Sequence, residues 1–202
     1  LHHNLMLLGT ERARLGDCAG AQQAIDEASA FLRAAAGTLS SQRFATFVHQ
    51  GHVAIMCGRW QQGLESLRTA LALARQAGKT RLSFYVLLHL IDAALLAGDA
   101  RAALEYSESA VHESRACNAR NYLALALLSR IEAALQAGAL DVARAAAREA
   151  LPLAADYRLH HAITAVFARL AMCTGAIAPA CLLLGYARTQ PQGSDQHALH
   201  EA

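Results

Sequence analysis

The chain has 202 residues, of which 54% are hydrophobic and 17% charged, and this composition excludes an intrinsically disordered segment. Its formal net charge of +2, without a run of five like charges, provides no basic patch for direct contact with nucleic acid. The longest apolar run, 123–128, is far shorter than the ~20 residues of a membrane-spanning helix, so we expect no membrane segment.

The start of the chain carries neither the charged segment of a secretory signal nor an initiator methionine. We therefore interpret the chain as part of a longer protein and expect a cytoplasmic location.

The cysteines form no Cys-x-x-Cys pair, and their odd number favours reduced, unpaired thiols over a disulfide framework. They are Cys18, Cys57, Cys117, Cys173 and Cys181.

Apolar residues at helical spacing, abundant alanine and only three prolines predict helix almost throughout. The predicted helices are 1–15, 19–36, 41–57, 60–77, 81–97, 100–116, 120–137, 140–155, 158–174 and 177–188. We expect Asp99 to cap the helix that follows it, and Pro152 to kink its helix or end it early. Five glycines each end an apolar run, where a glycine supplies the left-handed residue that closes a helix. These repeat glycines are Gly16, Gly58, Gly98, Gly138 and Gly175.

The repeat glycines are 42, 40, 40 and 37 residues apart, and small residues recur at fixed distances after them. The fifth position after each is alanine or glycine, and the twelfth is always alanine. Small side chains there let paired helices approach closely, as in the tetratricopeptide pattern. We predict an all-α protein, a right-handed α-solenoid of about five tetratricopeptide-like helix pairs. Its repeats are expected at 1–38, 39–79, 80–118, 119–156 and 157–188, before a frayed polar tail at 189–202.

Three segments of this array resemble one family, the C-terminal regions of large bacterial regulatory ATPases. The run 148–153 (Arg-Glu-Ala-Leu-Pro-Leu) resembles their last full repeat, 180–187 (Ala-Cys-Leu-Leu-Leu-Gly-Tyr-Ala) resembles their closing run, and 1–16 resembles a repeat start. The resemblance is to the maltose-activator type, and more closely to ATPases that begin with a winged-helix domain. It implies a regulatory or sensor segment of a larger ATP-dependent transcriptional regulator, although this chain lacks the nucleotide- and DNA-binding modules. The alternative is a free-standing adaptor that scaffolds protein–protein interactions.

No motif in the sequence predicts catalysis, a cofactor or a metal site. The Gly-Lys-Thr at 78–80 lacks the earlier glycine and the strand of a phosphate-binding loop, so we interpret it as a helix stop with Thr80 as the next N-cap. His49 and His52 share a helix and His89 occupies the repeat position of His49, but no cysteine or carboxylate completes a zinc set. We therefore expect a non-catalytic module, with a helical hydrolase or metal enzyme as the least favoured class.

Polar residues recur at one position in the first helix of each pair, six residues before the repeat glycine. In tetratricopeptide arrays this position faces the concave groove, where a protein or peptide segment, or a small effector, would bind. The carboxylates there favour a cationic or amine-bearing segment, and protonation of His52 below about pH 6.5 would modulate its binding. The predicted groove comprises His49, His52, Tyr85, His89, Asp92, Glu132 and Arg169.

A solvated face without a partner is the alternative interpretation of this polar column. A homo-oligomer, or an intramolecular contact with the ATPase module of a parent chain, is also open at this stage. The sequence therefore leaves open whether this polar column is a binding surface, and which partner would bind there.

Overall fold

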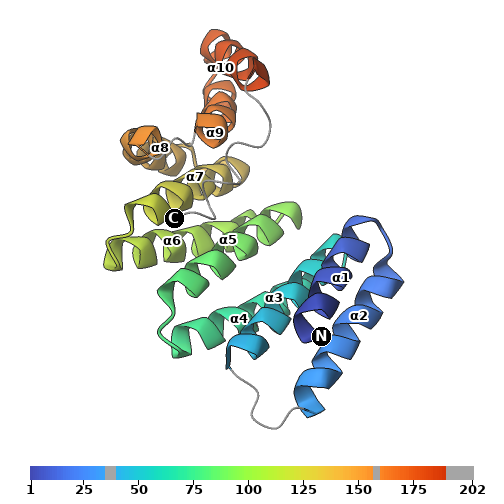
Figure 1. Ribbon diagram of the computed structural model, residues 1–202. Helices are drawn as coiled ribbons and strands as arrows, with labels where there is room; N and C mark the ends of the chain where they lie inside the picture. The colour runs from blue at the N-terminus through green and yellow to red at the C-terminus, as the bar shows by residue number, and fades with distance from the viewer. Residues whose placement is uncertain (35–39, 157–159, 190–202) are drawn as a thin grey trace. The chain divides into compact units, whose positions relative to one another are not determined.

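The computed structural model describes residues 1–34, 40–156 and 160–189, and every secondary-structure element in them is an α-helix (Figure 1). This confirms the predicted all-α class for the described part of the chain. Most predicted ends lie within two residues of the observed ones, while those at 36 and 158 and the tail from 190 fall outside the described residues. The helices are α1 (His2–Arg14), α2 (Cys18–Ala34), α3 (Ser40–Met56), α4 (Trp60–Gln76), α5 (Thr80–Leu96), α6 (Ala100–Ala116), α7 (Arg120–Gln136), α8 (Leu140–Asp156), α9 (His160–Cys173) and α10 (Ile177–Thr189).

The chain divides into two compact units, Leu1–Ala97 and Gly98–Ala202. In the first unit α1 packs on α2, α3 on α4 and α4 on α5, and α3 also contacts both α1 and α2. In the second unit α6 packs on α7, α7 on α8 and α9 on α10, and α9 also contacts both α7 and α8. Within each unit the first helix of one pair thus lies beside the first helix of the next, which is the stacking of a helical-repeat protein.

The turns inside each pair have the geometry that the repeat glycines predict. All five repeat glycines have positive φ, between 71° and 85°. At the end of α3 the N–H of Gly58 donates to the carbonyl of Ile55 and the N–H of Arg59 to that of Ala54, which is a Schellman motif. At the next turn the side chain of Asp99 accepts from the N–H of Ala102 at 3.0 Å, so the predicted N-cap of α6 is confirmed.

The turns between pairs use the same left-handed conformation at Gly78 (φ 63°) and Asn118 (φ 53°). Gly78 ends α4 as predicted, but the N-cap of α5 is Lys79 and Thr80 is already the first helical residue, so the predicted cap at Thr80 is wrong. Of the two alternatives predicted for Pro152, an early end of its helix is wrong, because α8 continues to Asp156, and a kink stays a prediction. Pro152 is exposed while its neighbours Ala150 and Leu153 are buried, and this packing holds the helix on both sides of the proline.

Small residues form the core where paired helices cross. Every described alanine at the twelfth position after a repeat glycine is fully buried. Between α3 and α4 the packing is tighter still: a methyl group on Gly51 would lie 2.7 Å from Cγ of Leu67, and one on Gly63 would lie 2.5 Å from Cγ1 of Ile55. The sequence pattern is therefore a consequence of how closely the backbones approach.

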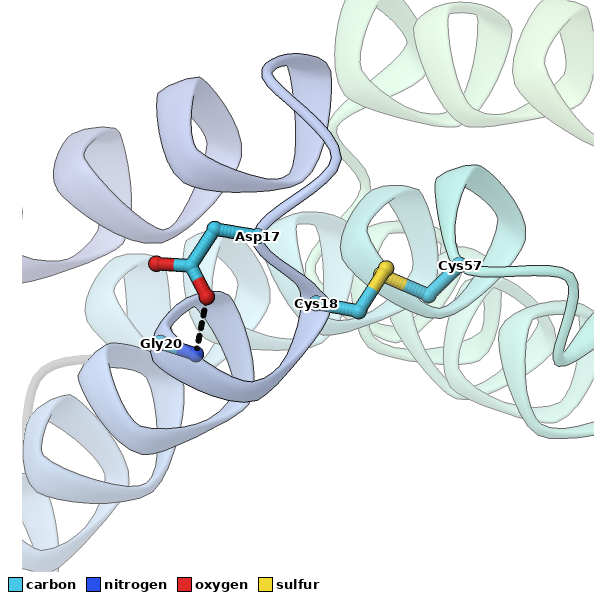
Figure 2. Close-up of a disulfide and its surroundings, with 4 residues drawn as sticks. All are labelled: Asp17, Cys18, Gly20 and Cys57. Atoms are coloured by element: carbon cyan, nitrogen blue, oxygen red, sulfur yellow. Dashed lines mark hydrogen bonds between the residues drawn. A yellow bond between two sulfur atoms is a disulfide. The ribbon is translucent and has the colours of Figure 1, made fainter.

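The prediction of unpaired cysteines is wrong at two positions, since Cys18 and Cys57 form a disulfide (Figure 2). Cys18 begins α2 and Cys57 follows α3, so repeat stacking brings the turn ends of successive pairs together. Cys117, Cys173 and Cys181 are free and exposed.

No helix in the described ranges has the length and hydropathy needed to cross a bilayer.

Candidate interaction surface

Four of the predicted groove residues come together in the first unit, on α3 and α5. The imidazole rings of His52 and His89 meet edge to face with centroids 4.1 Å apart, and the ring of Tyr85 meets His89 in the same way at 4.3 Å. His49 lies one helical turn before His52. We call these four side chains, His49, His52, Tyr85 and His89, the aromatic cluster.

The cluster is tied to α1 through a threonine. Thr10 Oγ1 lies 2.9 Å from Nδ1 of His49 and donates its own hydrogen to the carbonyl of Met6. Because a hydroxyl carries one hydrogen, the bond from Thr10 to Met6 is compatible with the tautomer of His49 that donates from Nδ1. Thr10 occupies the same repeat position as His52, which is the sequence signal for its role.

A second bond of the same kind joins α1 to α3. His2 Nε2 lies 2.9 Å from Oγ1 of Thr46, whose hydroxyl donates to the carbonyl of Gln42. Both His2 and Thr46 are buried. Sequence reasoning missed this pair, because neither residue falls in the polar column and their partnership depends on how α1 lies on α3.

Burial keeps the cluster uncharged. It lowers the pKa of His52 to about 4 and that of His89 to about 3, with a smaller contribution from the neighbouring histidine in each case, and it also lowers the pKa of His49. The expectation that His52 titrates near pH 6.5 is therefore wrong. At neutral pH the imidazoles act as polar aromatic rings without charge.

Two nitrogens of the cluster are left without a partner. Nε2 of His52 and Nε2 of His89 are both shielded from solvent and make no hydrogen bond among the described residues. An unsatisfied buried polar group costs about 1–3 kcal/mol of stability. Their accumulation on one surface is unusual for a purely structural core, where such groups are normally paired.

The exposed edge of this surface is formed by α5. Tyr85 is 46% exposed and Asp92 is exposed as well. Tyr85, His89 and Asp92 follow the i, i+4, i+7 spacing of one helix face. A binding partner would therefore first meet a tyrosine ring and a carboxylate, with the neutral imidazoles behind them.

The remaining predicted groove residues, Glu132 and Arg169, lie in the second unit and pair with each other. Nη1 of Arg169, on α9, donates to Oε1 of Glu132, on α7, at 3.2 Å, and both side chains are partly exposed. The expectation that the carboxylates of the polar column attract a cationic segment therefore needs correction at Glu132, whose carboxylate already pairs with the guanidinium of Arg169.

The geometry does not resemble a metal centre. The described residues contain no group of three or more histidine, cysteine, aspartate or glutamate side chains arranged to hold a metal ion. His52 and His89 contact each other through their rings, whereas metal ligands direct their nitrogens at a common point. The Gly-Lys-Thr segment at 78–80 lies in a turn between two helices and not between a strand and a helix.

No protein-family model matches the sequence, and no curated protein matches it. Solved structures do match the fold. BtubC (BKLC) from P. vanneervenii has a TM-score of 0.75 at 14% identity, with 92% of this chain and 78% of that chain covered. A Podosopora anserina putative kinesin light chain with nearly identical TPR-like repeats has a TM-score of 0.71 at 16% identity, with 92% of each chain covered.

The apo form of RapI has a TM-score of 0.73 at 12% identity, and this chain, 93% covered, spans about half of it (52%). At these identities the likeness concerns the fold alone. Together with the stacked helix pairs and the repeat glycines, it shows that the chain has a tetratricopeptide-like helical-repeat fold.

Proposed function

We propose that this chain is a non-catalytic binding module that takes a protein or peptide segment on the surface formed by the aromatic cluster and Asp92. The observation that carries the proposal is the pair of unpartnered nitrogens on His52 and His89. Polar rings whose burial lowers stability are retained most readily where they serve recognition. The repeat fold supports the proposal, because stacked helix pairs offer extended surfaces for other chains.

The chemistry of this surface favours a segment that carries a lysine, an arginine or another amine. The Tyr85 ring attracts cations through its π face, and the exposed Asp92 carboxylate lies on the same side of α5. The neutral imidazoles do not repel a cation, since burial keeps their pKa values far below 7. A small amine-bearing effector would satisfy the same groups.

The biological setting is a further part of the proposal. We propose that the module is the regulatory or sensor segment of a larger bacterial ATP-dependent transcriptional regulator in the cytoplasm, where it contacts its partner or the ATPase module of its own chain. It makes no direct contact with nucleic acid, in keeping with its scattered charge. The same surface suits a free-standing adaptor, which is the second candidate.

Binding is tested with an array of peptides that differ only in lysine, arginine, glutamate or glutamine at one position. We expect the protein to bind basic peptides and the Tyr85→Ala, Asp92→Asn double variant to bind at least tenfold more weakly with an unchanged melting temperature. The matched control is Tyr186→Ala with Glu105→Gln, which removes an exposed tyrosine and an exposed carboxylate from the second unit. Equal losses in both variants, or no preference for basic peptides, would count against the proposal.

The setting is tested by the coding sequence upstream of Leu1. An in-frame winged-helix domain and phosphate-binding loop support the regulator. A stop codon immediately before the codon for Leu1 contradicts it and leaves the adaptor.

A further inference from the structure

The disulfide between Cys18 and Cys57 joins the first helix pair to the second. Cys18 is the first residue of α2 and Cys57 directly follows α3, and their Cα atoms are 5.7 Å apart (Figure 2). The bridge spans 39 residues of sequence, including the whole of α2 and α3. Both cysteine residues are partly exposed, which exchange with a small thiol in solution requires.

The other repeats stack without such a bridge. Cys18 lies two residues after a repeat glycine, and Cys57 lies one residue before the next. The corresponding pairs further along the chain contain no cysteine and are Trp60 with Ala97, Ala100 with Ala137, and Leu140 with Thr174. The fold itself therefore does not require a covalent link at this position, and its presence in the first pair needs its own reason.

One reason lies in the small apolar core between the first pair and α3. This core contains two large, fully buried side chains from α1 and α2, Met6 and Ile25, which meet Val53 of α3 among alanines. By contrast α5 alone contributes Leu87, Leu90 and Ile91, all fully buried. The free energy gained by burying apolar side chains grows with the apolar area buried. We therefore expect the bridge to contribute more to the stability of the first pair than a bridge at the same position would contribute to a later pair.

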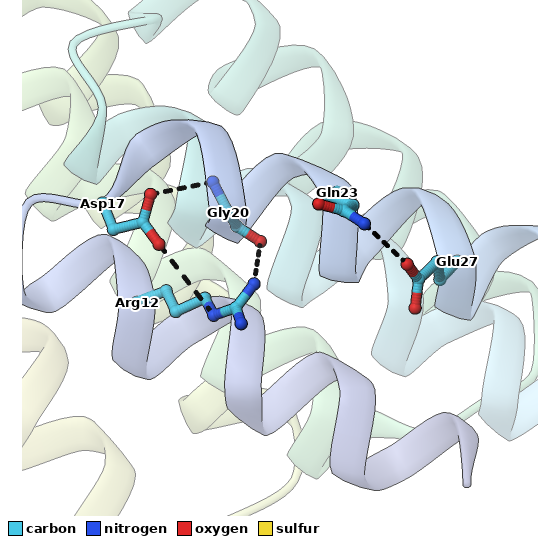
Figure 3. Close-up of polar contacts among 5 residues, drawn as sticks. All are labelled: Arg12, Asp17, Gly20, Gln23 and Glu27. Carbon is cyan, nitrogen blue, oxygen red and sulfur yellow. Dashed lines mark hydrogen bonds and ion pairs between the residues drawn. The ribbon is translucent and has the colours of Figure 1, made fainter.

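The two helices of the first pair are also tied to each other independently of the bridge (Figure 3). Arg12 of α1 donates from Nη1 to the carbonyl of Gly20 in α2 at 3.2 Å, and its Nε lies 3.9 Å from Oδ2 of Asp17. Asp17 in turn accepts from the N–H of Gly20. These bonds hold α1 and α2 as one hairpin whatever the state of the two sulfur atoms.

We propose that the Cys18–Cys57 disulfide is a redox latch that holds the α1–α2 hairpin on α3. A thiolate of a small thiol or dithiol attacks one sulfur of the bridge and forms a mixed disulfide with it, which releases the other cysteine. A second thiol then attacks the mixed disulfide and releases the first cysteine. Two electrons and two protons pass to the protein, which gains two thiols, while the reductant becomes a disulfide. Once the latch is open, the hairpin separates from α3 more often and uncovers Thr46 and His49.

The latch also regulates the aromatic cluster, and this consequence rests on the proposed function. His49 belongs to the cluster and is held by Thr10 of the hairpin. Loss of the hairpin removes that partner and admits water beside His49. Reduction is therefore expected to change binding without touching any residue of the exposed edge.

The test starts with the chain purified without reductant. Titration of thiols in denaturant should find three free thiols, those of Cys117, Cys173 and Cys181, and peptide mapping should find Cys18 joined to Cys57. Addition of a phosphine reductant should lower the melting temperature by on the order of 10 °C. Hydrogen exchange should accelerate in α1, α2 and the facing side of α3, and remain unchanged in α9 and α10.

The variants separate the latch from general thiol effects. The Cys18→Ser, Cys57→Ser double variant should resemble the reduced protein with or without reductant. The Cys173→Ser, Cys181→Ser control should retain the full response. Five free thiols in the purified chain, or a reduced protein with unchanged melting and exchange, would overturn the latch. If melting and exchange respond as expected while peptide binding does not, the latch stands and its coupling to the aromatic cluster through Thr10 and His49 is wrong.

Discussion

The imidazole rings of His52 and His89 lie edge to face, with their centroids 4.1 Å apart and both Nε2 atoms unpartnered. Replacing His89 with leucine removes one unsatisfied nitrogen at similar volume. We expect His89→Leu to raise the free energy of unfolding by about 1 kcal/mol in urea titrations at pH 7. His112→Leu, at an exposed position of α6, should change it by less than about 0.5 kcal/mol. A His89→Leu protein less stable than the parent would mean that the nitrogen is satisfied in solution.

The same two histidines make the free energy of unfolding depend on pH. Their folded pKa values, about 4 and about 3, lie below the ordinary 6.5, so below pH 6.5 the unfolded chain binds protons that the folded chain does not. Their titration leaves the free energy of unfolding unchanged above pH 6.5 and lowers it progressively as the pH falls towards 4. At pH 5 the loss should reach about 2 kcal/mol per histidine. Urea titrations between pH 7 and 4.5 should be markedly flatter for His52→Leu, His89→Leu, and parallel curves would refute this assignment.

The close approach of α3 and α4 makes Gly63 intolerant of a side chain. A methyl group there would lie 2.5 Å from Ile55 and 3.0 Å from the carbonyl oxygen of Gly51. We expect Gly63→Ala to lower the free energy of unfolding by about 1–3 kcal/mol, more than the gain in helix propensity restores. Gly185→Ala is the control, because a methyl group at Gly185 of α10 meets no atom within 4 Å. This second change should stabilise the protein by up to about 1 kcal/mol, and thermal unfolding followed by circular dichroism measures both.

The N-cap of α6 is a separate test of the local structure. Asp99→Ala removes the acceptor for the N–H of Ala102 and should lower stability by about 1 kcal/mol. Lys79 is the N-cap of α5 and makes no side-chain capping bond, so Lys79→Ala should be close to neutral. Similar losses for the two variants would show that the capping bond contributes nothing measurable.

The helices could be predicted from the sequence because their ends depend on local chemistry. The left-handed backbone that ends a helix favours glycine at Gly58 and Gly138 whatever packs around it. The capping bond of Asp99 is equally local, because it joins residues three apart in the chain. The polar column was visible for a related reason, since His52 and Glu132 interrupt otherwise apolar helices at a fixed distance from these glycines.

The properties of the surface could not be predicted in the same way, because they depend on tertiary packing. Whether His52 is charged depends on how deeply α3 and α5 bury it, and whether Glu132 is available depends on the reach of Arg169. The disulfide depends on the meeting of two turns that are 39 residues apart in sequence. Spacing within the sequence indicates which residues share a column, and the packing of neighbouring helices decides what those residues do.

The contact between Gly51 and Gly63 also constrains how the sequence can change over generations. The helices have no space left between them for an additional methyl group. A larger residue at position 51 therefore requires a smaller residue at position 67, and a larger residue at position 63 requires a smaller residue at position 55. A single change at either glycine passes through a less stable intermediate. Substitutions in this part of the chain are therefore expected to be accepted in compensating pairs, and related sequences should vary together at 51 with 67 and at 63 with 55.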